Sequence, residues 1–210
     1  MDFRLWLEDG RRTIKTLFER GIDRRDPSIL GYHGTSVQTM RAAIERGVLP
    51  VARGLKRVFG NQNDTAYGLH VSPNMDNRIV RTLEFRNPPE PDAYKDALAW
   101  ATHVSKRHSL FDMYGMDMNK SSHHRAASDI MMANDSPKST MKRLGLDHKP
   151  RETTTAGVIL AISDRVAERF RLLVGGDGND INIITNALPV EYILGIDPAD
   201  DAAYKWLDAL

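Results

Sequence analysis

The chain has no cysteine among its 210 residues, which excludes disulfide bonds, thiol chemistry and cysteine-ligated metal sites. It also lacks an apolar run long enough to span a bilayer, since the longest, residues 157–162, is far too short. The first nine residues mix charged and apolar side chains, so we expect no cleavable secretory signal. The 29 basic residues nearly cancel the 28 acidic ones, and net charge therefore indicates neither a nucleic-acid nor a membrane partner.

What is present is ordinary for a soluble globular protein: 41% of the residues are hydrophobic and 27% are charged. The length suits one domain, residues 1–210, with a substantial core. We find no internal repeat and no linker.

Helix and strand signals alternate near the amino terminus. Apolar residues at helical spacing predict a helix over residues 11–20, which Gly21 ends. Residues 29–33 read as a strand. Ser36 then caps a second helix, which ends at Gly47.

The rest of the chain predicts a mixture of helices and strands. Residues 53–66 and 134–155 are polar and are predicted to be loops. Helices are expected over 92–111 and 122–133, and strands over 69–71, 157–162, 172–174, 181–185 and 190–196. The fold class is therefore α+β.

Three segments each carry one polar side chain within a predicted strand. They are Gly31-Tyr32-His33-Gly34-Thr35-Ser36, Tyr67-Gly68-Leu69-His70-Val71-Ser72-Pro73 and Leu188-Pro189-Val190-Glu191-Tyr192-Ile193-Leu194-Gly195. The order is a histidine beside a glycine, then a ring residue, then a late glutamate. It resembles the His-Tyr-Glu class of ADP-ribosyltransferases, the diphtheria toxin and poly(ADP-ribose) polymerase group.

The resemblance covers roughly residues 28–86 and 156–198. It implies a split antiparallel sheet with flanking helices, a helical segment at 1–27 and a helical insertion at 92–155. It also implies NAD as co-substrate, no metal, and a cleft that brings together His33, His70 and Glu191.

In the resembled family the first histidine, here His33, bonds a ribose hydroxyl of NAD. The main chain of the next residue, Gly34, pairs with the nicotinamide carboxamide, and Thr35 adds a hydroxyl nearby. A glycine suits this role because no Cβ keeps a ligand from its peptide groups. The alternative is a hydrogen-bonded core histidine followed by a turn into the helix.

The second motif departs from the family pattern. His70 stands where a tyrosine ring stacks on nicotinamide, and Tyr67 is near enough to substitute for it, while Ser72 belongs to the same NAD-contacting strand. Strand alternation places Leu69 and Val71 on one face and His70 on the other. An imidazole is smaller than a phenol, and its charge near neutral pH would oppose the cationic ring of NAD.

Glu191 suits the chemistry of NAD cleavage. Nicotinamide leaves as a neutral pyridine, so no general acid is needed, in contrast to ordinary glycosides. One carboxylate is enough to bond the ribose and stabilise the positive charge of the transition state. The alternative is a solvent-facing glutamate on a half-buried strand.

The pyrophosphate requires cations or main-chain donors. Candidates flank the first two motifs, although loop cations are more often simply solvated. They are Arg53, Lys56 and Arg57 in the first loop, and Arg78 and Arg81 after the second motif.

We therefore expect an NAD-dependent mono-ADP-ribosyltransferase, a bacterial toxin or effector that modifies a protein in a target-cell cytosol. It would reach that cytosol without a cleavable signal, or else it is cytoplasmic. Pro189 occupies the position where arginine-modifying toxins carry Glu or Gln, which makes arginine a less favoured acceptor. An NAD glycohydrolase and a non-catalytic binding module are the alternatives.

Two further patterns are interpreted as structural. Residues 175–183 match one calcium-binding nonapeptide repeat, but a β-roll needs stacked copies, so we expect a turn between strands. Four histidines in the predicted helices lack metal-site spacing and are interpreted as solvated. They are His103, His108, His123 and His124.

Overall fold

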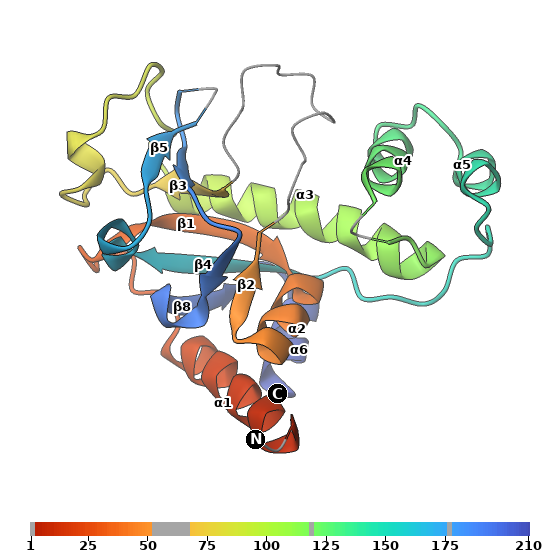
Figure 1. The fold of residues 1–210 in the computed structure, drawn as a ribbon, viewed down its shortest axis with the longest axis horizontal. Coiled ribbons are helices and arrows are strands. Elements are labelled where there is room, and N and C mark those ends of the chain that lie inside the picture. Colours follow the sequence, from red (N-terminus) through yellow and green to blue (C-terminus); the bar gives the residue numbers. More distant parts are fainter. Residues whose placement is uncertain (1–2, 52–67, 118–119, 176–177) are drawn as a thin grey trace.

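A computed structural model describes residues 3–51, 68–117, 120–175 and 178–210 (Figure 1). It has mixed α and β structure, in which helices flank a six-stranded antiparallel sheet of order β5-β6-β3-β1-β4-β8. β2 and β7 form a separate two-stranded ribbon. Within these ranges, every helix is too short or too polar to cross a membrane.

The bounds of the elements are as follows. The helices are α1 (Phe3–Arg20), α2 (Val37–Arg46), α3 (Ala93–Tyr114), α4 (Ser121–Met131), α5 (Pro137–Leu144) and α6 (Asp201–Asp208). The strands are β1 (Ile29–Ser36), β2 (Val48–Pro50), β3 (Leu69–Pro73), β4 (Gly157–Ser163), β5 (Leu172–Val174), β6 (Ile181–Ile183), β7 (Ala187–Pro189) and β8 (Ile193–Pro198). Single 3-10 turns span Val80–Thr82, Asp164–Glu168 and Val190–Tyr192.

The central sheet is buried on both faces. On one face, apolar residues such as Leu30, Leu160 and Ile196 share a core with α1, α2 and α6. On the other face, Ile29, Tyr32 and Ile159 pack against a row of alanines in α3. The nearly continuous apolar sequence of β4 follows from this double burial.

A small lobe follows α3. Helices α4 and α5 lie beyond the end of the sheet (Figure 1), and their apolar residues form a cluster of their own with the last turn of α3 and with Met116, two residues beyond that helix. The cluster consists of Phe111, Met116, Ala126, Ala127 and Met141. The lobe falls within the predicted insertion at residues 92–155.

Local signals predict several elements correctly. Ser36 caps α2 by accepting a hydrogen bond from the Thr39 N–H, and Gly47 ends it with a φ of 65°. β5 and β6 pair antiparallel, and the Gly175 N–H donates to the Asp180 carbonyl at the end of this pairing, as expected for two strands joined by a turn.

Other expectations need correction. Residues 134–155 are not wholly a loop, because Ser136 caps a helix with Pro137 in its first turn and Gly145 at its end. The predicted strand at 190–196 begins only at Ile193, since residues 190–192 form a 3-10 turn after Pro189. The sequence interpretation also missed β2, β7 and α6.

Candidate functional site

The two central strands, β1 and β3, are paired over only two residue pairs. The pairs are Gly31 with Pro73 and Tyr32 with Ser72. Beyond Tyr32, β1 stays paired with β4 as far as Ser36, whereas β3 continues its pairing with β6. The sheet is thus split, and the edge of β1 from His33 onward has no described partner strand on the β3 side.

This edge of β1 is suited to bind a polar ligand. Successive residues of a strand direct their N–H and C=O groups to alternate edges. The run His33–Thr35 therefore turns at least one peptide group toward the split, where it is not paired with β3. An unpaired peptide edge within a sheet can bond an amide such as a carboxamide.

His33 stands at the point where the strands separate. Its Nδ1 lies 2.7 Å from the backbone oxygen of His70 on β3. Burial lowers the pKa of His33 to about 4, so its ring is neutral at physiological pH. Because a carbonyl only accepts, Nδ1 carries the proton, and Nε2 presents a lone pair that can accept a hydroxyl hydrogen.

Gly34 has a packing role. A Cβ at this position would overlap the main chain of α3 at Ala97 and Ala101. The glycine lets α3 lie directly against β1, so that α3 covers one face of the sheet at the split. Thr35, the next residue, is buried.

His70 and Asp180 form an ion pair when the imidazole is protonated, and this pair was missed from the sequence. His70 Nδ1 lies 2.6 Å from Asp180 Oδ2, and the His70 side chain is 48% exposed. Leu69 and Val71 are buried on the opposite face, as strand alternation predicts. By the same alternation, the His70 ring and the His33 ring leave opposite faces of the sheet, and only the His70 carbonyl contacts His33.

A buried amide lies behind this pair. Asn182 is paired with His70 across the two strands and is fully buried, yet neither its Oδ1 nor its Nδ2 has a hydrogen-bond partner. The Asp180 Oδ1 atom is also buried without a partner. A Cβ at Gly175 would lie 3.0 Å from Asn182 Nδ2 and overlap the Asp180 carboxylate. The glycine therefore makes room for both polar groups.

Ser72 connects β3 to α3. Its hydroxyl donates to the Asp96 carboxylate of α3. The bond holds the flank of α3 that carries Asp96 beside β3, at the start of the split.

Glu191 does not belong to the row of residues that lie opposite His33 across β4 and β8. The register places His33 opposite Leu160 of β4, and Leu160 opposite Ile196 of β8. β8 begins at Ile193, about 10 Å along the strand from that row, and Glu191 precedes it in the 3-10 turn. The Glu191 side chain is exposed and is not held by another described residue. It is therefore not the apolar-strand carboxylate that we expected.

The structure describes only two of the cations proposed to bind the pyrophosphate. Arg53, Lys56, Arg57 and the substitute ring Tyr67 lie outside the described residues. Arg81 bonds the Met75 carbonyl at 2.9 Å and pairs with Asp76 at 3.3 Å, and Arg78 is exposed. Arg81 is thus engaged locally.

These residues define a candidate site by geometry. No family model, curated protein or solved structure matches this chain. We therefore infer a function from the split sheet and from the side chains around it.

Two of the histidines interpreted as solvated are structural instead. His108 Nδ1 lies 2.6 Å from the Ser36 hydroxyl, which ties α3 to the end of β1. Burial, with smaller effects from the charges of Arg107 and His124, lowers the pKa of His108 to about 3. His123 is buried and accepts a hydrogen bond from the Asp117 N–H at 2.8 Å.

In the parts of the chain that the structure describes, no three His, Asp or Glu side chains gather as a metal site.

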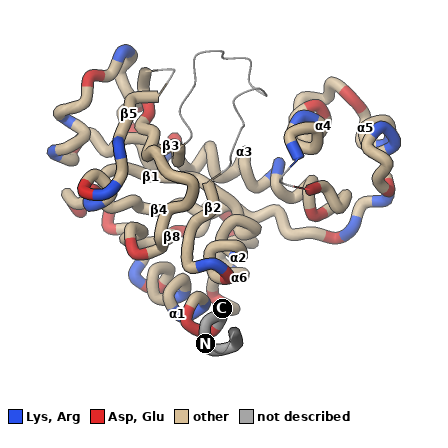
Figure 2. Tube along the Cα trace, viewed as in Figure 1, with Lys and Arg blue, Asp and Glu red and all other residues tan. Residues whose placement is uncertain are grey.

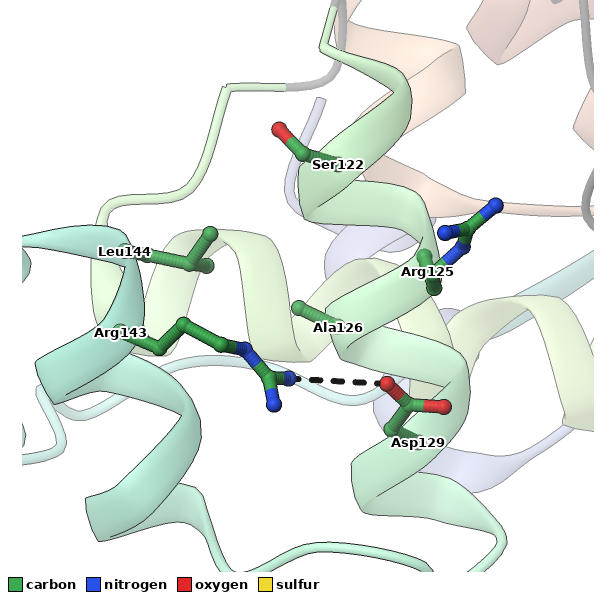
Figure 3. A pocket seen from close by; sticks show the side chains of 6 residues that line it. All are labelled: Ser122, Arg125, Ala126, Asp129, Arg143 and Leu144. Atoms are coloured by element: carbon green, nitrogen blue, oxygen red, sulfur yellow. Dashed lines mark ion pairs between the residues drawn. The ribbon is translucent and has the colours of Figure 1, made fainter.

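A second hollow lies in the lobe, away from the split. It has a volume of about 390 Å³ between α4 and α5 (Figure 3). Its lining includes the Arg143–Asp129 ion pair, at 3.6 Å, and Arg125. Charges of both signs are interspersed over the helices and loops, whereas β1 and β4 carry none (Figure 2). The charge pattern thus indicates no single-sign binding surface.

Proposed function

We propose that the protein is an NAD-dependent mono-ADP-ribosyltransferase, a bacterial toxin or effector that modifies a protein of a target cell. The split antiparallel sheet, with helices on both faces and a helical insertion, agrees with the fold that the three motifs imply. NAD would bind where β1 and β3 separate.

One observation carries the proposal: the Nδ1–H of His33 bonds the His70 carbonyl across the split, at 2.7 Å. This bond fixes the tautomer and turns Nε2 into an acceptor for a ribose hydroxyl. The edge of β1 beside it, which no described strand pairs with on the β3 side, offers peptide groups for the carboxamide. A hydroxyl acceptor and an amide-binding edge in one place suit the nicotinamide ribose of NAD.

The chemistry is a substitution at C1′ of that ribose. The C1′–nicotinamide bond breaks, and nicotinamide leaves neutral with the bonding electron pair. A nucleophile of the acceptor protein forms the new bond to C1′ and releases its proton to solvent. In this proposal Glu191 stabilises the positive charge on the ribose.

His33→Ala tests the proposal, with the exposed His148→Ala as the matched control. We expect weaker NAD binding by calorimetry and slower nicotinamide release for His33→Ala only, because the ribose bond exists in both ground and transition states. Losing one hydrogen bond corresponds to about a threefold to tenfold change in affinity. Unchanged binding would make His33 a structural histidine.

Labelled NAD incubated with target-cell lysate identifies the acceptor. Label on a protein supports the transferase. Release of free ADP-ribose without an acceptor indicates a glycohydrolase. NAD binding without nicotinamide release indicates a binding module.

A further inference from the structure

Arg107 is a buried cation that pairs with no counter-ion among the described residues. It belongs to α3 and is 4% exposed. Its Nε and Nη1 atoms are buried and have no hydrogen-bond partner, and it pairs with no carboxylate of a described residue. A buried guanidinium in this state destabilises the fold, because it loses hydration without gaining a partner. Such a group points to an anion that binds there.

The immediate neighbours of Arg107 do not balance its charge. The pKa of His103 is lowered by its burial and then by the charges of Arg107 and Lys106. The pKa of His108 is lowered to about 3, again by burial first and by Arg107 next. Both imidazoles are therefore neutral at physiological pH, and the guanidinium remains the dominant charge at this place.

Arg107 shares one flank of α3 with three other residues. Asp96, Trp100, His103 and Arg107 are spaced by four, three and four positions, which puts them on one stripe of the helix. Ser72 of β3 bonds Asp96, so this stripe lies toward β3. That is the side on which the sheet is split.

The stripe runs along the split. Ala97 and Ala101 of α3 abut Gly34, and His108 reaches Ser36, so α3 follows β1 in the same direction. The stripe therefore begins at the junction of β1 with β3 and continues beside the unpaired part of β1.

Trp100 adds an aromatic surface to the stripe. It is 43% exposed, and its ring stacks on His103 with centroids 5.4 Å apart and planes 20° apart. The helix rise from Trp100 to Arg107 is about 10 Å. An aromatic platform followed by an unpartnered guanidinium matches a ligand that joins a flat ring to an anion.

We propose that this flank of α3 is a nucleotide subsite, in which Arg107 binds the diphosphate and Trp100 stacks on the base. The assignment of the nucleotide as NAD rests on the proposed function. A guanidinium grips phosphate oxygens bidentately, which Lys cannot do. Arg107 then destabilises the protein while no ligand is bound, and a bound diphosphate supplies the partner that its guanidinium lacks.

Arg107→Met tests the proposal, with the adjacent exposed Lys106→Met as the control that removes one charge. Methionine fills the space without a charge, so we expect a higher Tm for the free protein. We also expect about tenfold or greater loss of affinity for ADP-ribose and for inorganic pyrophosphate by calorimetry. Lys106→Met should keep both affinities.

Two further variants separate the two parts of the subsite. Arg107→Lys keeps the charge but not the fork, so it should bind both probes more weakly than wild type. Trp100→Ala should weaken ADP-ribose binding and leave pyrophosphate binding unchanged. Loss of neither affinity in Arg107→Met, or a lower Tm with normal binding, overturns the proposal, as does a wild-type protein that binds neither probe.

Nicotinamide release distinguishes this proposal from the proposed function. If wild type binds ADP-ribose through Arg107 but releases no nicotinamide from NAD, the subsite stands and the transferase fails. If Arg107→Met binds NAD and releases nicotinamide as wild type does, the subsite fails and the transferase stands.

Discussion

At the scale of single residues, several polar groups lie together beside the split, and one hydrogen bond crosses it. Asp180 holds the His70 ring at 2.6 Å, and the fully buried Asn182 lies beside Asp180 against Gly175. The His70 main chain in turn fixes the tautomer of His33. A buried amide without a hydrogen-bond partner destabilises the fold. The presence of Asn182 here therefore favours a functional over a purely structural role.

His70 makes NAD binding sensitive to pH if its ring faces the nicotinamide. Protonation would place a positive charge against a cationic pyridinium, so affinity should fall as the pH drops and the His70 ring gains a proton. His70→Tyr should flatten this dependence. Asp180→Asn, which removes the anion that favours the protonated ring, should move it to lower pH. Calorimetric NAD affinity from pH 5.5 to 8 measures both effects, and a flat wild-type profile places His70 outside the cleft.

Glu191→Gln should slow nicotinamide release by about 10² to 10³ and leave NAD affinity within a few-fold. The reason is that a carboxylate acting only on the charged transition state contributes little to ground-state binding. The exposed Glu168→Gln is the control. Because the structure places Glu191 in the 3-10 turn before β8 and outside the row of His33, this variant is the most direct check on the third motif. Normal release would remove Glu191 from the mechanism.

The position of a single side chain could be predicted from the sequence only where it depends on neighbouring residues. The alternation of Leu69, His70 and Val71 follows from the strand period, and the structure agrees. The contact of His70 with Asp180 joins residues 110 positions apart, which no local pattern encodes. Arg107 carries no motif at all, and only its burial distinguishes it from other cations.

At the scale of elements, α2 and α3 are tied to the end of β1 by Ser36, which caps α2 and contacts His108. Ser36 was predictable as a cap, because capping is a local preference. Its second contact required α3 to be in place. Similarly, α5 was missed because it is short and mostly polar, with Met141 and Leu144 as its large apolar residues, although Ser136, Pro137 and Gly145 mark both of its ends.

The free energy of unfolding should fall as the pH drops below about 6.5. The folded-state pKa values of His108 and His33 are lowered to about 3 and about 4, so between these values and 6.5 the unfolded chain binds more protons. Each histidine thus removes up to about 1.4 kcal/mol of stability per pH unit in that range. Urea unfolding at pH 7.5, 6 and 5 measures this. His108→Asn should reduce the slope, and the exposed His148→Asn should not.

At the scale of the whole molecule, the chain combines the split sheet with a lobe that has its own apolar cluster. The α+β class and most elements were predictable, because the spacing of apolar residues along the chain differs between helices and strands. The lobe's packing was not, since it depends on how Phe111 of α3 meets α4 and α5.

If the protein is the transferase that we propose, the residue that it modifies should not be arginine. Pro189 closes β7 where the arginine-specific enzymes carry an acidic or amide side chain, and it can neither donate nor accept through a side chain. Mass spectrometry of a labelled target should therefore locate ADP-ribose on another residue type. Label chiefly on arginine would contradict this expectation.

The short junction between β1 and β3 also predicts where the sheet would open first. Two residue pairs hold the sheet halves together, and Pro73 has no N–H to add to them, while Asn74 bonds the carbonyls of Leu30 and Ile29 at the same end. The half β3-β6-β5 should thus exchange its amide hydrogens as a separate cooperative unit, faster than β1-β4-β8. A ligand bound across the split would join the two units and slow that exchange. Hydrogen exchange with and without NAD would then report occupancy even for a variant that has lost all turnover.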